Sequence, residues 1–306
     1  MTESRTQRPL PKRGSSEQAA ERIQPAMISQ LDCAGRMLDL THPQVMGVLN
    51  VTPDSFSDGG QHAGTAAALD WAAQMAEEGA AIIDVGGEST RPGAEPVPVD
   101  QELERVVPVV EGIVGAGLDV IVSVDTSKPE VMRAATAAGA GMVNDIRALA
   151  LPGALEAVRD AAVPVCLMHM QGEPRTMQAA PQYTDVVQEV KAFLRQRAER
   201  CIAAGIGRER LLVDPGIGFG KELRHNLLLL RHLQELAQLD LPILVGLSRK
   251  RMIGTLLGGA PVDQRLYGSV AGAAMAAWLG AAVVRVHDVR ATVEALKICD
   301  AVRSAD

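Results

Sequence analysis

The chain has 306 residues, of which 47% are hydrophobic, and a formal net charge of −7 at pH 7. This length and apolar content are sufficient for one large buried core. The acidic balance excludes the broad basic surface on which nucleic-acid binding depends, so we expect no nucleic-acid partner. No stretch approaches the roughly 18 consecutive apolar residues of a membrane span, so we expect no membrane partner.

The four cysteines, Cys33, Cys166, Cys201 and Cys299, lie far apart in the sequence. This spacing is not typical of a disulfide framework or a zinc site, and it favours a reducing, cytoplasmic location.

Residues 1–26 are polar and lack the apolar core of a secretory signal. We interpret them as a disordered tail that precedes a single domain over residues 27–306. An organelle transit peptide is the alternative, against which Glu3, Glu17 and Glu21 count.

After the tail, residues 27–40 read as two short strands that turn at Ala34 and Gly35, a hairpin able to close the bottom of a barrel. Eight segments rich in Val, Ile and Leu follow, and each runs into a loop that opens with a polar residue. We expect strands at 45–50, 81–85, 120–124, 141–144, 164–168, 211–214, 242–246 and 282–286. Helical patterns separate them, among them 66–78, 100–114 and 183–204. Eight strand–loop–helix units in a chain of this length predict a (β/α)₈ TIM barrel.

In such a barrel the residues just past each strand share one rim. We therefore expect convergence of Asn50, Asp84, Asp125, Asn144, His169, Asp214, Lys250 and Arg285. A single Asp after a strand has little meaning, but eight polar residues in phase indicate an active site.

One side of this rim is suited to an anion. Arg249, Lys250 and Arg285 supply positive charge from the last two strands, and Asn50 lies on the neighbouring first strand. Together these groups fit a diphosphate that shares its oxygens with Mg²⁺. The alternative is that Arg249 and Lys250 form surface ion pairs.

The other side is suited to a flat, donor-rich heterocycle. Asp125 and Asp214 offer acceptors to ring N–H groups, and Asn144 can match mixed donors and acceptors. Met168 and Phe219 could cover the ring faces, although such residues are often merely core. Asp125 could instead cap the helix that starts near Lys128.

Two loops, 51–60 and 86–93, are rich in Gly, Ser and Pro and suit lids that exclude water. A rigid turn without a catalytic role would have a similar composition. The glycines of DPGIGFGK (214–221) do not make a phosphate-binding P-loop. His169 and His287 follow strands five and eight, a position that by itself decides nothing about function.

Eight segments, in order and at family spacing, resemble the motifs of dihydropteroate synthase, the folate-pathway enzyme that sulfonamides target. They are MGVLNVTPDSFSDGG, DVGGESTRPGA, VSVDTSKP, MVNDIRAL, LMHMQGEPRTMQ, DPGIGFGK, GLSRKRMIG and RVHDV. The resemblance covers roughly residues 30–302. It implies a (β/α)₈ barrel that joins p-aminobenzoate to 6-hydroxymethyl-7,8-dihydropterin diphosphate and releases dihydropteroate and diphosphate. It also implies Mg²⁺ and a homodimer.

By motif position, the resemblance assigns a role to each site residue. The pterin residues are Asp125, Asn144, Asp214 and Lys250, to which we add Met168 and Phe219, the ring-face candidates named above. The diphosphate residues are Asn50, Arg285 and His287, with Asn50 also carrying Mg²⁺. Thr90, Arg91, Pro92 and Ser248 would lie near p-aminobenzoate. Phe56 and Asp58 would act from the first loop, so that Asp125, Lys250, Phe56 and Asp58 form the expected catalytic set.

The chain departs from the family at Ile217, where Phe is frequent, which we interpret as a volume change beside the pocket, and in its longer polar N-terminus. Two rival functions share the barrel. A pterin-domain methyltransferase would not need NVTPDSFSDGG or SRK, and a catalytically silent pterin-binding paralogue would not need every catalytic position filled.

Overall fold

The computed structural model describes residues 28–52, 60–89 and 93–305. Within them, eight parallel strands close into a barrel in the order β10-β3-β4-β5-β6-β7-β8-β9. The strands are β3 (Gln44–Asn50), β4 (Ile82–Gly86), β5 (Ile121–Asp125), β6 (Met142–Asp145), β7 (Val165–Met168), β8 (Leu211–Asp214), β9 (Ile243–Gly246) and β10 (Ala281–Val286). The pairing of β10 with β3, which aligns Val284 with Val45, closes the ring. The predicted TIM barrel is therefore confirmed.

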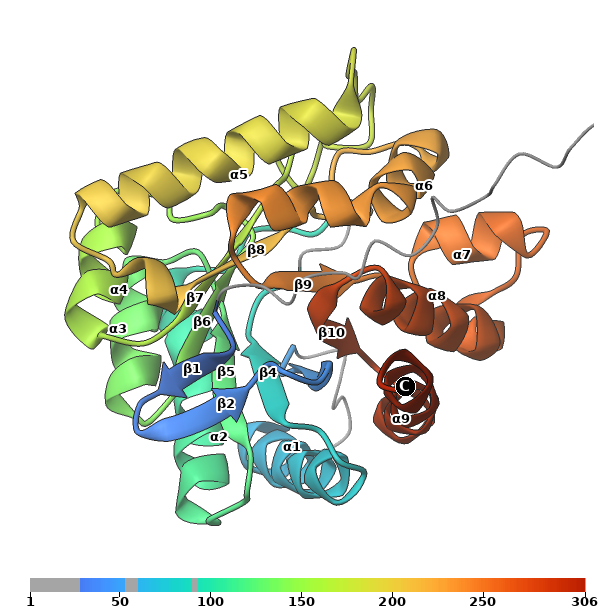
Figure 1. The fold of residues 1–306 in the computed structure, drawn as a ribbon. Helices are drawn as coiled ribbons and strands as arrows, with labels where there is room; N and C mark the ends of the chain where they lie inside the picture. Colours follow the sequence, from blue (N-terminus) through green and yellow to red (C-terminus); the bar gives the residue numbers. More distant parts are fainter. Residues whose placement is uncertain (1–27, 53–59, 90–92, 306) are drawn as a thin grey trace, which may run out of the picture.

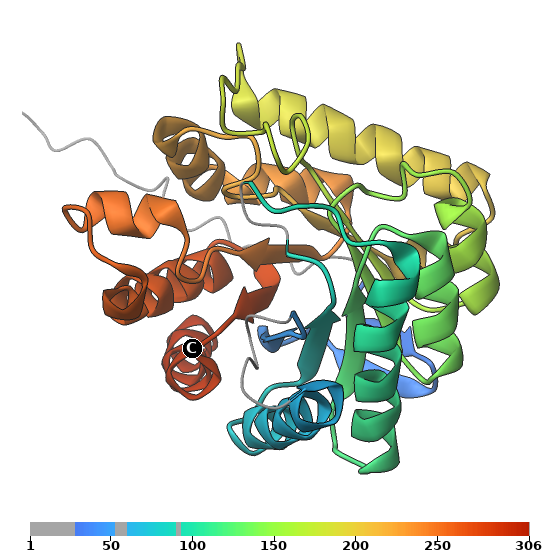
Figure 2. The ribbon, with the colours of Figure 1, turned by 180° about the vertical axis from the view of Figure 1, so that it is seen from behind.

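Helices surround the barrel on its outer side (Figures 1 and 2). They are α1 (Gly60–Glu77), α2 (Val99–Gly115), α3 (Pro129–Ala137), α4 (Ala154–Ala161), α5 (Val186–Ala203), α6 (Leu223–Arg231), α7 (Arg251–Leu256), α8 (Leu266–Trp278) and α9 (Val289–Arg303). Short 3₁₀ helices lie between some of them, η2 (Arg208–Arg210), η3 (Leu233–Leu239) and η4 (Val262–Gln264). Small and branched side chains from both layers fill the space between strands and helices, as the low aromatic content predicts.

A hairpin of β1 (Gln30–Cys33) and β2 (Arg36–Asp39) closes the amino-terminal end of the barrel. Its turn residues Ala34 and Gly35 both have positive φ, at 55° and 87°, as two-residue hairpin turns require. Its buried side chains Leu31, Cys33 and Leu38 pack with one residue from each barrel strand in a single apolar cluster. The amino-terminal end is thus sealed by side chains, which leaves the carboxyl-terminal end for the site.

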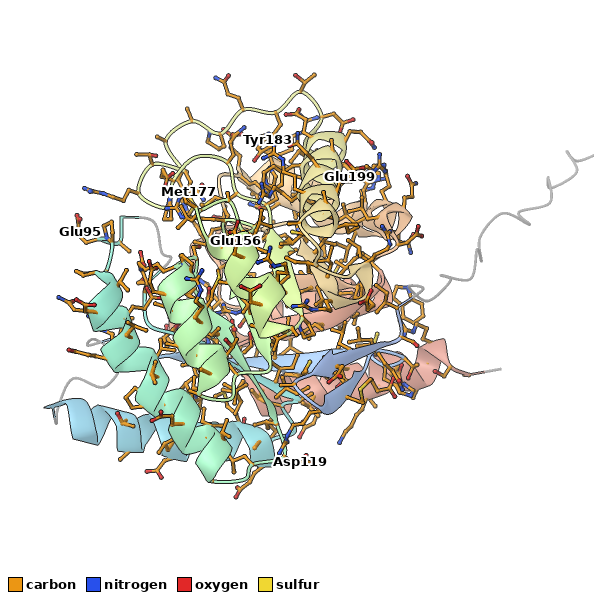
Figure 3. The ribbon with its side chains drawn as sticks, turned by 90° about the vertical axis from the view of Figure 1, so that its left-hand side faces the viewer. Glu95, Asp119, Glu156, Met177, Tyr183 and Glu199 are labelled. Atoms are coloured by element: carbon orange, nitrogen blue, oxygen red, sulfur yellow. The ribbon has the colours of Figure 1, made fainter. Side chains whose placement is uncertain are left out.

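The two ends of the barrel are distinguished in Figure 3, where Met177 and Tyr183 of the loop after β7 lie opposite Asp119, which precedes β5. The loop after β7 extends further than its composition predicts, because α5 begins at Val186 rather than Tyr183. Asp185 caps this helix by accepting hydrogen bonds from the backbone N–H groups of Val187 and Gln188 at 3.1 and 3.2 Å. The predicted tail, 1–26, lies outside the described residues.

Candidate active site

A group of charged and amide side chains meets at the carboxyl-terminal end of the barrel, and we call it the rim cluster. Its members are Asp84, Asp125, Asn144, Asp214 and Arg285, from β4, β5, β6, β8 and β10. Asp84, Asp125, Asn144 and Asp214 are all buried. Because buried carboxylates are costly unless they are paired, the partners of these groups define what the cluster can do.

Arg285 is the central cation of the rim cluster. Its Nε donates to Asp84 Oδ2 at 2.6 Å, and its Nη2 donates to Asp125 Oδ2 at 2.8 Å. Asn144 Nδ2 donates to the same oxygen of Asp84 at 3.0 Å. One guanidinium therefore joins strands that are 160 and 201 residues away in sequence, and it fixes the orientation of both carboxylates.

The charge states of the rim cluster follow from burial and from these ion pairs. Burial raises the pKa of Asp125 to about 7, although the charge of Arg285 acts in the opposite direction. Burial would lower the pKa of Arg285, but the charges of Asp84 and Asp125 outweigh it and raise that pKa. Asp125 is therefore poised to change charge near neutral pH, whereas Arg285 stays cationic.

Lys250 follows β9, the strand that pairs with β10, and its side chain reaches the loop that follows β8. Its Nζ donates to the backbone oxygen of Ile217 and lies 4.7 Å from the centre of the Phe219 ring. Burial lowers the pKa of Lys250 to about 8, against the attraction of Asp214. Lys250, Phe219 and Asp214 thus come together as predicted, and Lys250 is not a surface ion pair.

Arg249 corrects the prediction for the anion side. Its guanidinium pairs with Asp288, with Nε donating to Oδ2 at 3.0 Å. Its backbone has a φ of 57°, which turns the chain after β9. The surface ion-pair alternative is therefore right for Arg249.

Asn50 lies beside Asp125 across a glycine. The register places Asn50, Gly86 and Asp125 in one row across β3, β4 and β5. A Cβ on Gly86 would lie 3.7 Å from both Asn50 Oδ1 and Asp125 Oδ2. The glycine keeps this space open, so Asn50 and Asp125 face the same part of the site.

Ser248 and His287 contact each other at the ends of β9 and β10. Ser248 Oγ accepts from the backbone N–H of His287 at 3.2 Å and lies 3.1 Å from its Nδ1. Ser248, predicted to lie near p-aminobenzoate, is therefore a neighbour of His287, predicted to bind diphosphate.

His169 does not converge with the other rim residues, which corrects that prediction. Met168 faces the barrel interior, and since side chains alternate along a strand, His169 faces the helices. Its ring lies 4.9 Å from the Phe193 ring, and its Nδ1 lies 2.9 Å from Lys221 Nζ. Burial and the charge of Lys221 lower the pKa of His169 to about 3, so that it is neutral and structural.

Asp84 lies on the rim as expected, but its pairing with Arg285 was not predicted, and no role was predicted for Lys221. Lys221 is buried and donates to the backbone oxygens of Gly216 and Phe219, each at 2.9 Å, and so supports the loop that carries Phe219. Asp84 is fully buried and pairs with Arg285. The signal for Asp84 was an acid inside an apolar strand, which needs a buried partner.

The remaining predictions concern Asp125 as a helix cap, the place of Ile217, and the site residues of the two loops. Asp125 does not cap α3, because Lys128 N–H is bound instead by Thr126 Oγ1 at 3.2 Å. The side chain of Ile217 belongs to the core between barrel and helices rather than to the pocket. Phe56, Asp58, Thr90, Arg91 and Pro92 lie outside the described residues.

The comparisons with known proteins agree with this geometry. The family of pterin binding enzymes matches residues 46–287. A dihydropteroate synthase of Escherichia coli K12 is 56% identical over 276 residues, which cover 90% of this chain and 97% of that protein. The chain belongs to the dihydropteroate synthase family.

Solved structures of family members match the whole barrel. A Xanthomonas albilineans dihydropteroate synthase with 4-aminobenzoic acid has a TM-score of 0.86 at 56% identity, covering 91% of this chain and 99% of that one. A structure of the Xanthomonas albilineans enzyme in complex with 7,8-dihydropteroate has a TM-score of 0.82 at 53% identity, covering 90% and 100%. These solved family members are named as dihydropteroate synthases, not as pterin-domain methyltransferases or silent paralogues.

Two further features concern membrane spans and the state of the cysteines. Within the described ranges, none of the helices has the length and hydropathy of a membrane span. The four cysteines are free thiols.

Proposed function

We propose that this transferase condenses 6-hydroxymethyl-7,8-dihydropterin diphosphate with p-aminobenzoate to give 7,8-dihydropteroate and diphosphate. The observation that carries this proposal is the rim cluster, in which Arg285 joins the buried carboxylates Asp84 and Asp125. Charge of both signs at the closed floor of a barrel mouth suits a ring with a donor-rich edge.

The pterin ring is assigned to the acidic side of the rim cluster. Asp125 and Asp214 accept from ring N–H groups, and Asn144 offers both a donor and an acceptor. Met168 and Phe219 cover the ring faces, and Lys250 contacts its edge. The burial of Met168 and the cation–π contact of Lys250 with Phe219 support this assignment.

Asn50, Arg285 and His287 are assigned to the diphosphate, with Mg²⁺ held by Asn50. Asn50 Oδ1 beside the open space at Gly86 is the kind of oxygen ligand that Mg²⁺ prefers. When bound, Mg²⁺ supplies positive charge to the diphosphate.

The p-aminobenzoate is assigned to Thr90, Arg91, Pro92 and Ser248, with Phe56 and Asp58 acting from the first loop. The contact of Ser248 with His287, which we assign to the diphosphate, supports this assignment.

In the reaction, the bond between the pterin CH₂ carbon and the diphosphate oxygen breaks, and its electron pair leaves with diphosphate. The amine lone pair of p-aminobenzoate forms the new C–N bond, and the nitrogen then loses a proton. Arg285 and His287 stabilise the charge that grows on the diphosphate. Asp125 stabilises positive charge on the ring as diphosphate leaves. No nucleophilic side chain is needed, because the amine of p-aminobenzoate is the nucleophile.

The discriminating experiment measures diphosphate release from dihydropterin diphosphate by the purified protein, with and without p-aminobenzoate. We expect release that depends on p-aminobenzoate and equals the dihydropteroate formed. A methyltransferase or a silent paralogue would show no such release.

The ionisation of Asp125 and Lys250 predicts a bell-shaped pH profile of kcat/KM. Asp125 must be charged, and since its pKa is raised to about 7, activity falls as the pH drops below that value. Lys250 must be protonated, and since its pKa is lowered to about 8, activity falls as the pH rises above that value. Steady-state kinetics between about pH 6 and 9 check this. Lys250→Arg should remove the alkaline limb, and a flat profile in the parent would contradict the assignment.

The chain is also proposed to form a homodimer through α8. Tyr267, Met275 and Trp278 have exposed fractions of 86, 54 and 47%, and Leu256 and Leu257 at the end of α7 are exposed as well. Large apolar side chains exposed on neighbouring helices favour a protein interface, and a second copy of the chain is the occupant that we propose. Sedimentation of the parent and of Tyr267→Lys would test it, since a parent that sediments as a monomer contradicts the proposal.

A further inference from the structure

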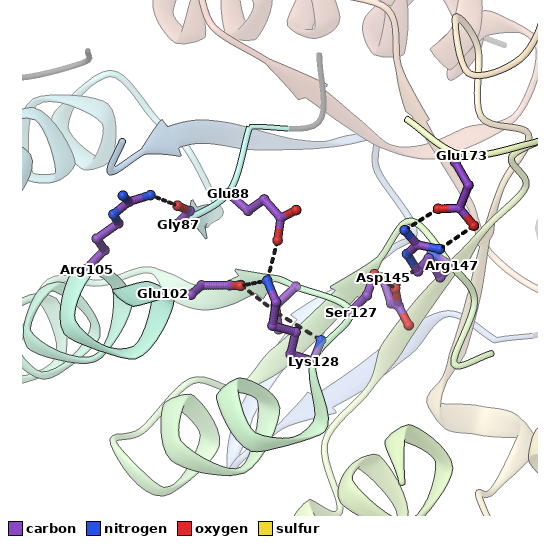
Figure 4. A network of polar contacts seen from close by, with 10 residues as sticks. Gly87, Glu88, Glu102, Arg105, Ser127, Lys128, Asp145, Arg147 and Glu173 are labelled. Atoms are coloured by element: carbon purple, nitrogen blue, oxygen red, sulfur yellow. Dashed lines mark hydrogen bonds and ion pairs between the residues drawn. The ribbon is translucent and has the colours of Figure 1, made fainter. Parts of the chain in front are cut away.

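A second group of buried charges lies beside the rim cluster, and the chemistry described above does not use it. Glu102 of α2 is fully buried. Its Oε1 accepts from Thr126 Oγ1 at 2.6 Å, and its Oε2 accepts from Lys128 Nζ (Figure 4). A carboxylate at this depth destabilises the fold unless such partners are present, so its presence calls for a role.

Lys128 has a second carboxylate partner, Glu88, in the loop that follows β4 (Figure 4). The exposed fractions of the Lys128 and Glu88 side chains are 18 and 31%. Burial would lower the pKa of Lys128, but the hydrogen bonds and charges of the two glutamates outweigh it and raise that pKa. Lys128 therefore stays cationic and ties the loop after β4 to α2. We call Glu88, Glu102 and Lys128 the α2 anchor.

The start of the same loop rests directly on α2. Arg105 Nη1 donates to the backbone oxygen of Gly87 at 2.8 Å. A Cβ on Gly87 would lie 2.8 Å from Val106 Cγ2 and 2.9 Å from Glu102 Cγ, closer than real Cβ contacts. Only glycine allows this approach, so the loop is seated on the helix at Gly87 and tied to it at Glu88.

The α2 anchor also fixes the end of β5. Thr126, whose hydroxyl is bound by Glu102, directly follows Asp125. The backbone N–H of Thr126 donates to the Asn144 oxygen at 3.1 Å. A single buried carboxylate thus holds both the residue after Asp125 and, through Lys128, the loop after β4.

We propose that Lys128 is a positioning residue for p-aminobenzoate. Its two ion pairs tie Glu88, at the start of the loop after β4, to Glu102, which also binds the residue after Asp125. Through this tie Lys128 would set the p-aminobenzoate side relative to the pterin side. This inference rests on the proposed assignment of Thr90, Arg91 and Pro92 to p-aminobenzoate, since Glu88 lies two residues before Thr90. A displacement of about 1 Å in such a place can cost about two orders of magnitude in rate.

The test replaces Glu88, because removing Lys128 would leave Glu102 buried without its cation and could prevent folding. Glu88→Ala keeps the pair of Lys128 and Glu102. We expect it to raise the KM for p-aminobenzoate about tenfold, while the KM and Kd for dihydropterin diphosphate change less than about twofold. Glu88→Gln, which keeps a neutral acceptor, should give a smaller rise.

The matched control is Glu235→Ala. The Glu235 side chain has an exposed fraction of 35% and pairs with Lys191 at 3.8 Å, between η3 and α5 outside the strand ring. It should change neither KM. If Glu88→Ala leaves the KM for p-aminobenzoate unchanged, or raises both KM values equally, the positioning role is wrong.

A parallel measurement on Arg91→Ala separates this inference from the proposed function. A raised KM for p-aminobenzoate in Arg91→Ala but not in Glu88→Ala overturns the role of Lys128 alone. An unchanged KM in Arg91→Ala overturns the assignment of residues 90–92, on which the role of Lys128 rests.

Discussion

Asp125→Asn should lower kcat/KM by about 10²- to 10³-fold while the barrel stays folded. Asparagine has the same shape and can still accept from Arg285 Nη2, which in the parent lies 2.8 Å from Asp125 Oδ2. It lacks the negative charge that stabilises the ring as diphosphate leaves, and in a buried site that charge has a large effect. Steady-state kinetics with both substrates, and calorimetry with dihydropterin diphosphate, measure the loss.

Asp145→Asn is the control for this substitution. Asp145 is fully buried on the next strand, but its carboxylate accepts from the backbone N–H groups of Arg147 and Leu149, each at 2.8 Å. Asp145→Asn should lower the melting temperature, but it should lower kcat/KM far less than Asp125→Asn does. If Asp125→Asn binds dihydropterin diphosphate as tightly as the parent and turns over normally, Asp125 has been assigned to the wrong role.

Arg285→Ala should have the second large effect, on both stability and diphosphate binding. It leaves Asp84 and Asp125 buried without their shared cation, which costs about 3–5 kcal/mol of unfolding free energy when one partner of a buried pair is removed. The attraction that holds down the pKa of Asp125 is also lost, so the acid limb of the activity profile should move to higher pH. Denaturant unfolding and pH-dependent kinetics check the two effects.

Lys250→Ala is the comparison for Arg285→Ala. Lys250 donates to a backbone oxygen and touches Phe219, so its removal breaks no hydrogen bond to a carboxylate of the rim cluster. Free diphosphate should therefore bind much more weakly to Arg285→Ala than to Lys250→Ala, and pterin binding should suffer in Lys250→Ala. Equal losses of diphosphate binding in both variants would show that the two roles are not separate.

The eight strands and their rim could be predicted because each apolar segment ends where a polar residue begins. The pairing of Arg285 with Asp84 could not be predicted. It depends on the register in which β10 pairs with β3 to close the barrel, and the sequence does not reveal that register. His169 was misplaced because the position after a strand was read without the alternation of its side chains. With Met168 facing inward, that alternation turns His169 outward.

Arg249 and Glu102 show a second limit. Arg249 stands beside Lys250 in sequence, yet a left-handed turn at Arg249 directs its charge to Asp288. Glu102 appears in the sequence as an ordinary acid of an amphipathic helix, but it is buried where Gly87 packs on α2 and where Thr126 and Lys128 bind its carboxylate. Both outcomes depend on the path of a loop, which composition alone does not determine.

The most direct test of the central claim is a crystal structure of the protein with bound dihydropterin diphosphate. We expect the amino-pyrimidinone edge of the ring to lie within hydrogen-bond distance of Asp125, Asn144 and Asp214, with the diphosphate toward Asn50, Arg285 and His287. A ring bound elsewhere, or bound with its diphosphate against Asp214, would contradict it.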